Sequence, residues 1–106
     1  MGKVARLTFL GIALVGYGPG GALAAADFFP DSSTTYIAPS DLGNLDCYGL
    51  WHARNEIFAR LHYRFKTAKA QAEFGTTGYV DYPNFNPYES KNIALIQQYE
   101  KAGYCG

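Results

Sequence analysis

The chain has 106 residues, and its nine Lys and Arg balance its nine Asp and Glu to a formal net charge of zero. The length allows a single small domain. The interspersed charges exclude nucleic-acid binding of the kind that relies on clustered cations to neutralise many phosphates.

Residues 1–26 have the pattern of a secretory signal peptide. Two basic residues precede an uncharged apolar run, residues 7–15, and small residues follow with A-x-A cleavage patterns that end at Ala24 and Ala26. The run is shorter than the roughly 20 residues of a membrane-spanning helix, which disfavours the alternative of an uncleaved anchor. We therefore expect an exported protein, periplasmic or extracellular, whose remaining domain, residues 27–106, has no membrane span.

The two cysteines, Cys47 and Cys105, are expected to form one disulfide. Cleavage after Ala26 leaves a domain of 80 residues with a net charge near −2. A core of this size is marginal, and exported proteins meet an oxidising environment that favours disulfides. Free thiols are the alternative, whereas neither cysteine has the basic surroundings of a catalytic thiolate.

The domain begins with residues 27–40, which we name the leading segment. It is rich in Pro, Ser and Thr and is predicted to run extended over the surface. Ser40 is predicted to cap a short helical turn at Asp41 and Leu42, and Gly43 to end it. Asp46 is predicted to cap a helix that covers Cys47 to about His62. Its apolar face contains three aliphatic residues, Leu50, Ile57 and Leu61.

Thr67 is predicted to cap a short helix over residues 68–74. Residues 76–85, the aromatic link, contain Gly, Pro and aromatic residues and are predicted to hold themselves in place by burying rings. Asn86 to Glu89 then form a capping-box variant with Pro87 at the first helical position, which predicts a helix to about Lys101. The expected fold class is therefore all-α and small. We expect two principal helices, a short third helix and long aromatic-rich loops, held together by the disulfide.

Several stretches together resemble one known family. They are Phe29 to Tyr36 (FPDSSTTY), Asp41-Leu42, Leu50 to Phe65 with its core RNEIFARLHYRF, Pro83 to Phe85 (PNF) and Lys91 to Glu100 (KNIALIQQYE). With these pieces the chain resembles the YARHG domain, a small module of exported bacterial proteins. The resemblance implies a non-catalytic binding or structural role in the bacterial cell envelope, and no cofactor.

The chain departs from that family in the pentapeptide that gives it its name. Residues 58–62 read FARLH, so that Leu61 stands where the family has His and His62 where it has Gly. A catalytic base at the family's His is absent here, so we interpret the motif as structural. Its residues are Arg54, Asn55, Glu56, Ile57, Phe58, Ala59 and Arg60. We expect Arg54 and Asn55 to bond the aromatic link or the leading segment, and Arg60 either to do the same or to be exposed.

His52 and Glu56 lie one helical turn apart, and they are the residues on which two alternatives rest, a metal site and a hydrolase site. With Asp46 or Glu89 they form a weak candidate metal site, and with His62 they form the candidate site of a small secreted hydrolase. A solvated ion pair explains the same spacing. We therefore expect no metal and no enzymatic activity.

A stripe of tyrosines, Tyr79, Tyr82 and Tyr88, provides a candidate ligand surface. Grooves edged by Tyr, Trp and Arg suit glycans or peptides, and export places cell-wall glycan or an envelope protein within reach. Rings that fill the core or anchor loops are the alternative explanation for the same residues.

Overall fold

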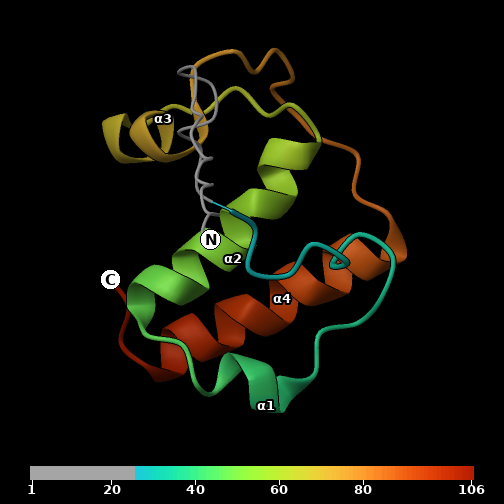
Figure 1. The fold of residues 1–106 in the computed structure, drawn as a ribbon, viewed down its shortest axis with the longest axis vertical. Coiled ribbons are helices and arrows are strands. Elements are labelled where there is room, and N and C mark those ends of the chain that lie inside the picture. Colours follow the sequence, from blue (N-terminus) through green and yellow to red (C-terminus); the bar gives the residue numbers. More distant parts are fainter. Residues whose placement is uncertain (1–25) are drawn as a thin grey trace, which may run out of the picture.

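The structure is a computed structural model that describes residues 26–106, so the predicted signal peptide lies outside the described residues except for Ala26. The described part folds into four helices, α1 (Pro39–Leu42), α2 (Cys47–Arg60), α3 (Ala68–Phe74) and α4 (Pro87–Ala102), as Figure 1 shows. It contains no strand, only an isolated parallel bridge between Tyr63 and Val80. The prediction of a small helical fold is confirmed. None of these helices is long and apolar enough to cross a membrane.

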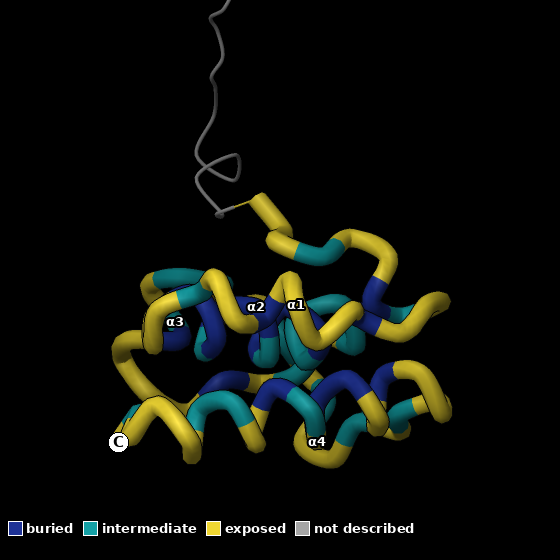
Figure 2. The backbone as a smooth tube through the Cα atoms, turned by 90° about the horizontal axis from the view of Figure 1, so that it is seen from below, coloured by how far each residue is buried: buried dark blue, intermediate teal, exposed yellow. Residues whose placement is uncertain are grey.

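The core lies between the two long helices, α2 and α4, which run beside one another with α1 packed against α4 (Figures 1 and 2). Its buried aliphatic residues come from three helices and the leading segment: Ile37, Leu42, Leu50, Ala53, Ile57, Ile93 and Ile96. Leu61 is only half-buried and belongs to no core cluster, contrary to prediction. The reason is that α2 ends at Arg60, so Leu61 lies outside the helix and does not continue its buried face.

The helix starts follow the capping residues of the sequence. Asp46 accepts a hydrogen bond from the Gly49 amide, and Thr67 caps α3 in the same way. Asn86 and Glu89 exchange both bonds of a capping box at the start of α4. Ser40 is the exception, because α1 begins one residue earlier at Pro39 and has no side-chain cap. Proline fixes the backbone for a first helical position, and this replaces the predicted serine cap.

The predicted disulfide between Cys47 and Cys105 is present, and its Cα atoms lie 5.5 Å apart. Cys47 opens α2, whereas Cys105 follows the end of α4. The bond therefore joins the two principal helices at one end of the core. The cysteines are 58 residues apart in the sequence, so cross-linking them removes much conformational freedom from the unfolded chain.

At the other end of α2, the chain turns sharply and is held by the aromatic link. His62 adopts a left-handed conformation, with φ of 62°, at the position where the family has glycine. Its carbonyl oxygen accepts hydrogen bonds from the amides of both Tyr79 and Val80, and the Arg64 amide donates to Val80. Backbone hydrogen bonds thus hold the aromatic link in place. The prediction that it buries its rings is largely wrong, because Tyr79 and Tyr82 are 64% and 91% exposed.

Gly78 is required by this close contact between two backbones. A Cβ atom at Gly78 would lie 2.0 Å from the Tyr63 carbonyl oxygen, which cannot move without breaking the neighbouring bonds. We expect Gly78→Ala to lower the free energy of unfolding by about 1–3 kcal/mol, as overpacking does. Gly43→Ala is the control, since its Cβ would meet only ordinary contacts. Equal denaturation midpoints in urea for the two variants would contradict this role.

Removing the disulfide gives a second prediction. We expect the double variant Cys47→Ser/Cys105→Ser to lose about 4 kcal/mol of stability, as the chain-entropy treatment gives for a loop of this length. Chemical denaturation of the oxidised protein and of the variant measures this difference. A loss below about 1 kcal/mol would show that the helix pair does not depend on the bond.

Candidate functional site

Glu56 of α2 binds the start of the leading segment. Its side chain is buried, with the residue only 1% exposed. Its Oε1 accepts a hydrogen bond of 2.8 Å from the Phe28 amide, and its Oε2 accepts one of 2.7 Å from the Phe29 amide. Because these amides belong to neither helix nor strand, they need side-chain partners. Glu56 provides a bond for each of them.

Arg60, one turn further along α2, binds the same segment with its guanidinium group. It donates to the Phe29 carbonyl oxygen at 3.0 Å and to the hydroxyl oxygens of Ser32 and Ser33 at 2.9 and 2.6 Å. Its Nε also lies 3.1 Å from Oδ2 of Asp27. The sequence left two alternatives open for Arg60, bonding and exposure. The structure shows that Arg60 bonds the leading segment.

Asn92 of α4 fastens the leading segment from the opposite side of the core. Its amide nitrogen donates to the carbonyl oxygens of Ser32 and Thr35, and its Oδ1 accepts from the Ile37 amide, all at 2.8–2.9 Å. It is only 1% exposed. Sequence reasoning missed this residue, although it stands one turn before Ile96 on the apolar stripe. A single amide on a buried face is the signal that points to such a role.

Arg54 and Asn55 do not bond the segments expected of them. Arg54 forms a two-pronged ion pair with Glu100 of α4, at 2.7 and 3.0 Å, and Asn55 donates to the Trp51 carbonyl within its own helix. Those predictions are wrong, because side chains of this kind bond whichever polar group lies nearest in the folded chain. Elsewhere in the motif, Ile57 is in the core and Ala59 is half-buried.

The motif's aromatic residue, Phe58, packs where α2 meets the aromatic link. Its ring makes edge contacts with Phe85 and Tyr63, at centroid distances of 5.0 and 5.2 Å. Such edge-to-face pairs add about 0.5–1.5 kcal/mol beyond the area they bury. Phe58 therefore stabilises the junction at the end of the helix.

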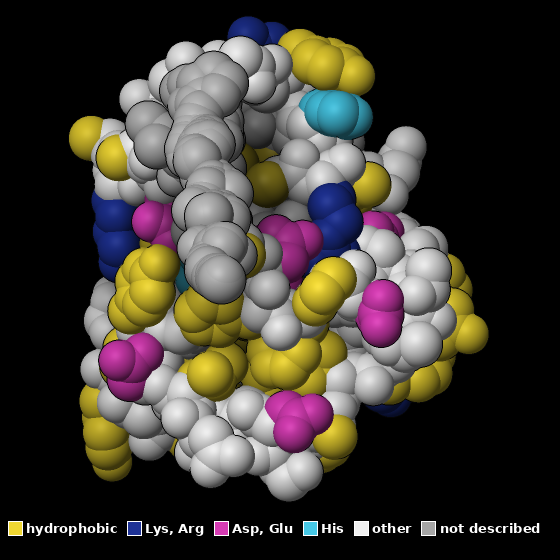
Figure 3. All heavy atoms as spheres, viewed as in Figure 1, with side chains coloured by type: hydrophobic (Ala, Val, Ile, Leu, Met, Phe, Trp, Pro, Cys, Tyr) yellow, Lys and Arg dark blue, Asp and Glu magenta, His cyan; other side chains and the backbone are white. Residues whose placement is uncertain are grey.

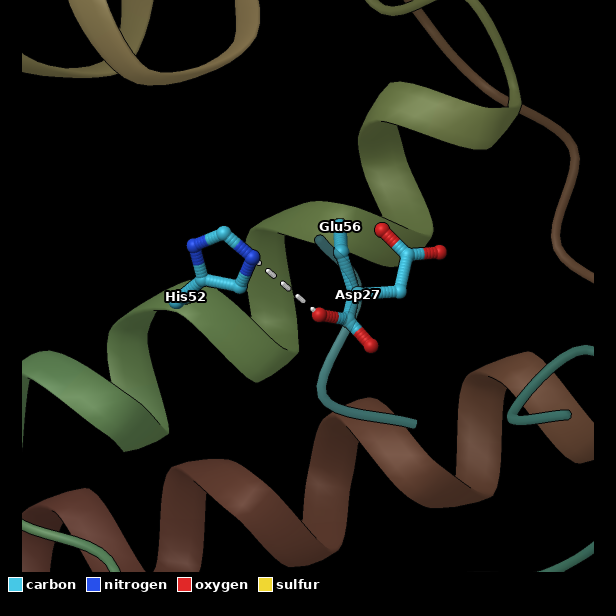
Figure 4. Close-up of side chains that lie close together, drawn as sticks. All are labelled: Asp27, His52 and Glu56. Carbon is cyan, nitrogen blue, oxygen red and sulfur yellow. Dashed lines mark ion pairs between the residues drawn. The ribbon is translucent and has the colours of Figure 1, made fainter. Parts of the chain in front are cut away.

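His52 is completely buried between aromatic rings and two carboxylates. Phe28 stacks on one side at 4.6 Å, and the Phe74 ring lies 4.9 Å away. Nδ1 lies 2.5 Å from Oε2 of Glu73, and Nε2 lies 3.3 Å from Oε1 of Glu56, the contact that Figure 4 shows.

Tyr48 extends this polar chain to the surface, because its hydroxyl also bonds to Oε2 of Glu73. This bond lowers the pKa of Glu73, as does the bond from His52, and it raises the pKa of Tyr48. Burial raises the pKa of Glu56, although the Phe28 and Phe29 amides act against this shift. Sequence reasoning found His52 and Glu56 but not Glu73 or Tyr48. Glu73 comes from α3, so its contacts with both α2 residues depend on how α3 packs.

The groups of the hydrolase alternative do not converge. His62 is exposed beyond the end of α2, where it stacks on Tyr79, whereas His52 and Glu56 are buried in the middle of the helix. The predicted third metal ligands are also elsewhere, since Asp46 and Glu89 cap α2 and α4. Instead Asp27 lies near His52 and Glu56, with one ligand atom of each residue within 4.8 Å of the others (Figure 4).

The candidate ligand residues Tyr79, Tyr82 and Tyr88 are all exposed. Tyr79 stacks on His62, and Tyr88 packs at a tilt against Tyr36, so two of these rings already contact a neighbour. Over the face in Figure 3, acidic and basic side chains are interspersed and form no basic patch.

A shallow groove of about 880 Å³ lies beside the disulfide, and we name it the disulfide groove. It brings together the start of α2, the end of α4 and α3. Lys69 holds its ammonium group 4.1 Å from the centre of the Trp51 ring. The side chains that line the groove and matter below are Tyr48, Trp51, Arg54, Lys69, Lys101 and Tyr104.

The hydrogen bonds of the two asparagines predict different effects on stability. We expect Asn92→Ala to lower the free energy of unfolding by about 2–4 kcal/mol, because it leaves three backbone groups without partners, two of them buried. Asn55→Ala, the matched control, loses one bond within its helix and should cost less than about 1.5 kcal/mol. Thermal unfolding of both variants tests the order, and a larger loss for Asn55→Ala would contradict it.

The comparisons with known proteins place these features in a family. The YARHG domain family matches residues 26–101, which is most of the chain. Neither a curated protein nor a solved structure matches it. The match covers the leading segment, the aromatic link and all four helices except Ala102, the last residue of α4. The chain therefore belongs to the YARHG domain family.

Proposed function

We propose that this chain is a non-catalytic module of the bacterial cell envelope, acting outside the cytoplasm, with cell-wall glycan as its ligand. The observation that carries the proposal is the bonding of Glu56. Both of its oxygens accept backbone amides of the leading segment. A carboxylate that acts as a general base must lie within reach of a substrate proton. The Glu56 carboxylate is buried and instead holds the leading segment on α2.

The disulfide groove supplies the surface for the ligand. Tyr48 and Tyr104 are exposed by 46% and 94%, which leaves their rings open to contact with sugar rings. Lys69 and Lys101 add hydrogen-bond donors, while Arg54 is neutralised by Glu100. A concave surface with aromatic rings and a few polar groups is the common form of a ligand site. Tyr79, Tyr82 and Tyr88 are the second candidate surface.

Binding to purified peptidoglycan sacculi tests the proposal and separates the two surfaces. We expect the protein to sediment with sacculi, and Tyr104→Ser to raise the dissociation constant about tenfold, since an aromatic contact contributes about 1 kcal/mol or more. Tyr82→Ser is the matched control, because Tyr82 is 91% exposed and lies outside the groove. The reverse order would assign the ligand to the tyrosine surface.

The same incubation also tests the hydrolase alternative, through the release of soluble fragments. We expect no release of soluble fragments from the sacculi. Release that continues over many turnovers and disappears in Glu56→Gln would overturn the non-catalytic role. Failure of the protein to sediment at all would overturn the glycan ligand.

A further inference from the structure

The hydrogen bonds of His52 leave one of its ring nitrogens unexplained. Nδ1 lies 2.5 Å from Glu73, so a neutral imidazole carries its hydrogen there and has a lone pair on Nε2. That lone pair lies 3.3 Å from Oε1 of Glu56, which is itself an acceptor. Two acceptors at this distance repel each other unless a proton or a metal cation lies between them.

A proton on Nε2 does not resolve this arrangement. Among the described residues, Nε2 is the buried side-chain polar atom without a hydrogen-bond partner, because the geometry towards Glu56 does not make a hydrogen bond. His52 is completely buried, so water is not freely available to accept such a proton. An unpaired buried donor of this kind costs about 1–3 kcal/mol. A metal ion does not require the donor, hydrogen and acceptor to lie in line.

We propose that Nε2 of His52, Oε1 of Glu56 and a carboxylate oxygen of Asp27 bind a divalent transition-metal ion such as zinc. Two ligand atoms on a tetrahedral zinc ion, each about 2.0–2.1 Å from the metal, lie about 3.3 Å apart. Nε2 and Oε1 have this separation. The bond from Nδ1 to Glu73 is the outer carboxylate contact that orients a metal-binding histidine.

Asp27 completes the set from the leading segment. Its ligand atom lies within 4.8 Å of the other two, so its side chain must move inward to bind the ion. It is free to do so, because the side chain is 34% exposed. The same exposure provides a path for the ion from solvent.

Arg60 is compatible with a cation at this place. It contacts Glu56 through Oε2 at 3.4 Å, whereas His52 faces Oε1, and it holds Asp27 through Oδ2 alone. Three carboxylates, Asp27, Glu56 and Glu73, surround the imidazole, and the cations near them are the guanidinium of Arg60 and, on the Glu73 side, the ammonium group of Lys69. The cluster therefore lacks positive charge, which a divalent ion supplies. The bound ion would tie the first residues of the leading segment to α2.

Calorimetric titration of the protein with zinc chloride tests this site, with magnesium chloride as the comparison. We expect one zinc ion per chain, a rise in melting temperature, and no comparable effect of magnesium, which prefers oxygen ligands. Asp27→Asn should weaken zinc binding at least tenfold without unfolding the protein, since Asp27 is exposed. Glu73→Gln should weaken it about 10–100-fold through the outer contact.

Asp41→Asn is the matched control, because it removes an exposed carboxylate from α1, away from His52. Its zinc affinity should equal that of the unmodified protein. Three results would overturn the site: no zinc binding up to millimolar concentration, equal weakening in Asp41→Asn, or unchanged affinity in Asp27→Asn. Nitrogen NMR of the imidazole gives an independent result, since a hydrogen found on Nε2 at saturating zinc would also exclude the site. None of these outcomes depends on glycan binding.

Discussion

The fold depends on side chains that satisfy the backbone of an irregular segment. Residues 28–37 cross the helix pair without joining a helix or a strand, and turn bonds satisfy only some of their amide and carbonyl groups. Glu56 and Arg60 from α2, and Asn92 from α4, provide further partners from two sides. The polar residues of the motif are therefore part of the architecture. They allow a coil to cover a core that two helices alone would leave open.

This arrangement suits a domain with few aliphatic residues. The core holds a small number of Ile and Leu side chains, and aromatic pairs extend it at the edges. The disulfide ties one end of the helix pair, while the backbone contact at Gly78 holds the chain beyond the other end of α2. Domains of this size need such additional restraints, because their hydrophobic burial barely exceeds the entropy lost on folding.

The helices were predictable because their signals are local. Asp46, Thr67 and the Asn86 to Glu89 box act within one turn, and each begins a helix where expected. The bonding partners were not predictable in the same way. Asn55 and Asn92 have the same side chain and lie on similar helices, yet only Asn92 faces the leading segment. Likewise Glu73 reaches His52 because of the way α3 packs on α2, a contact between residues 21 apart that no local pattern encodes.

The left-handed turn at His62 links two distant positions in the family's sequences. A residue with a side chain costs about 1–2 kcal/mol in this conformation, which glycine adopts freely. In this chain the imidazole stacks on Tyr79 at 5.1 Å and offsets part of that cost. A relative with glycine at the turn has no ring to place there, so an aromatic residue at position 79 would lack this stacking partner. The residues at positions 62 and 79 should therefore covary, and members with an aromatic ring at both positions would form a distinct branch of the family.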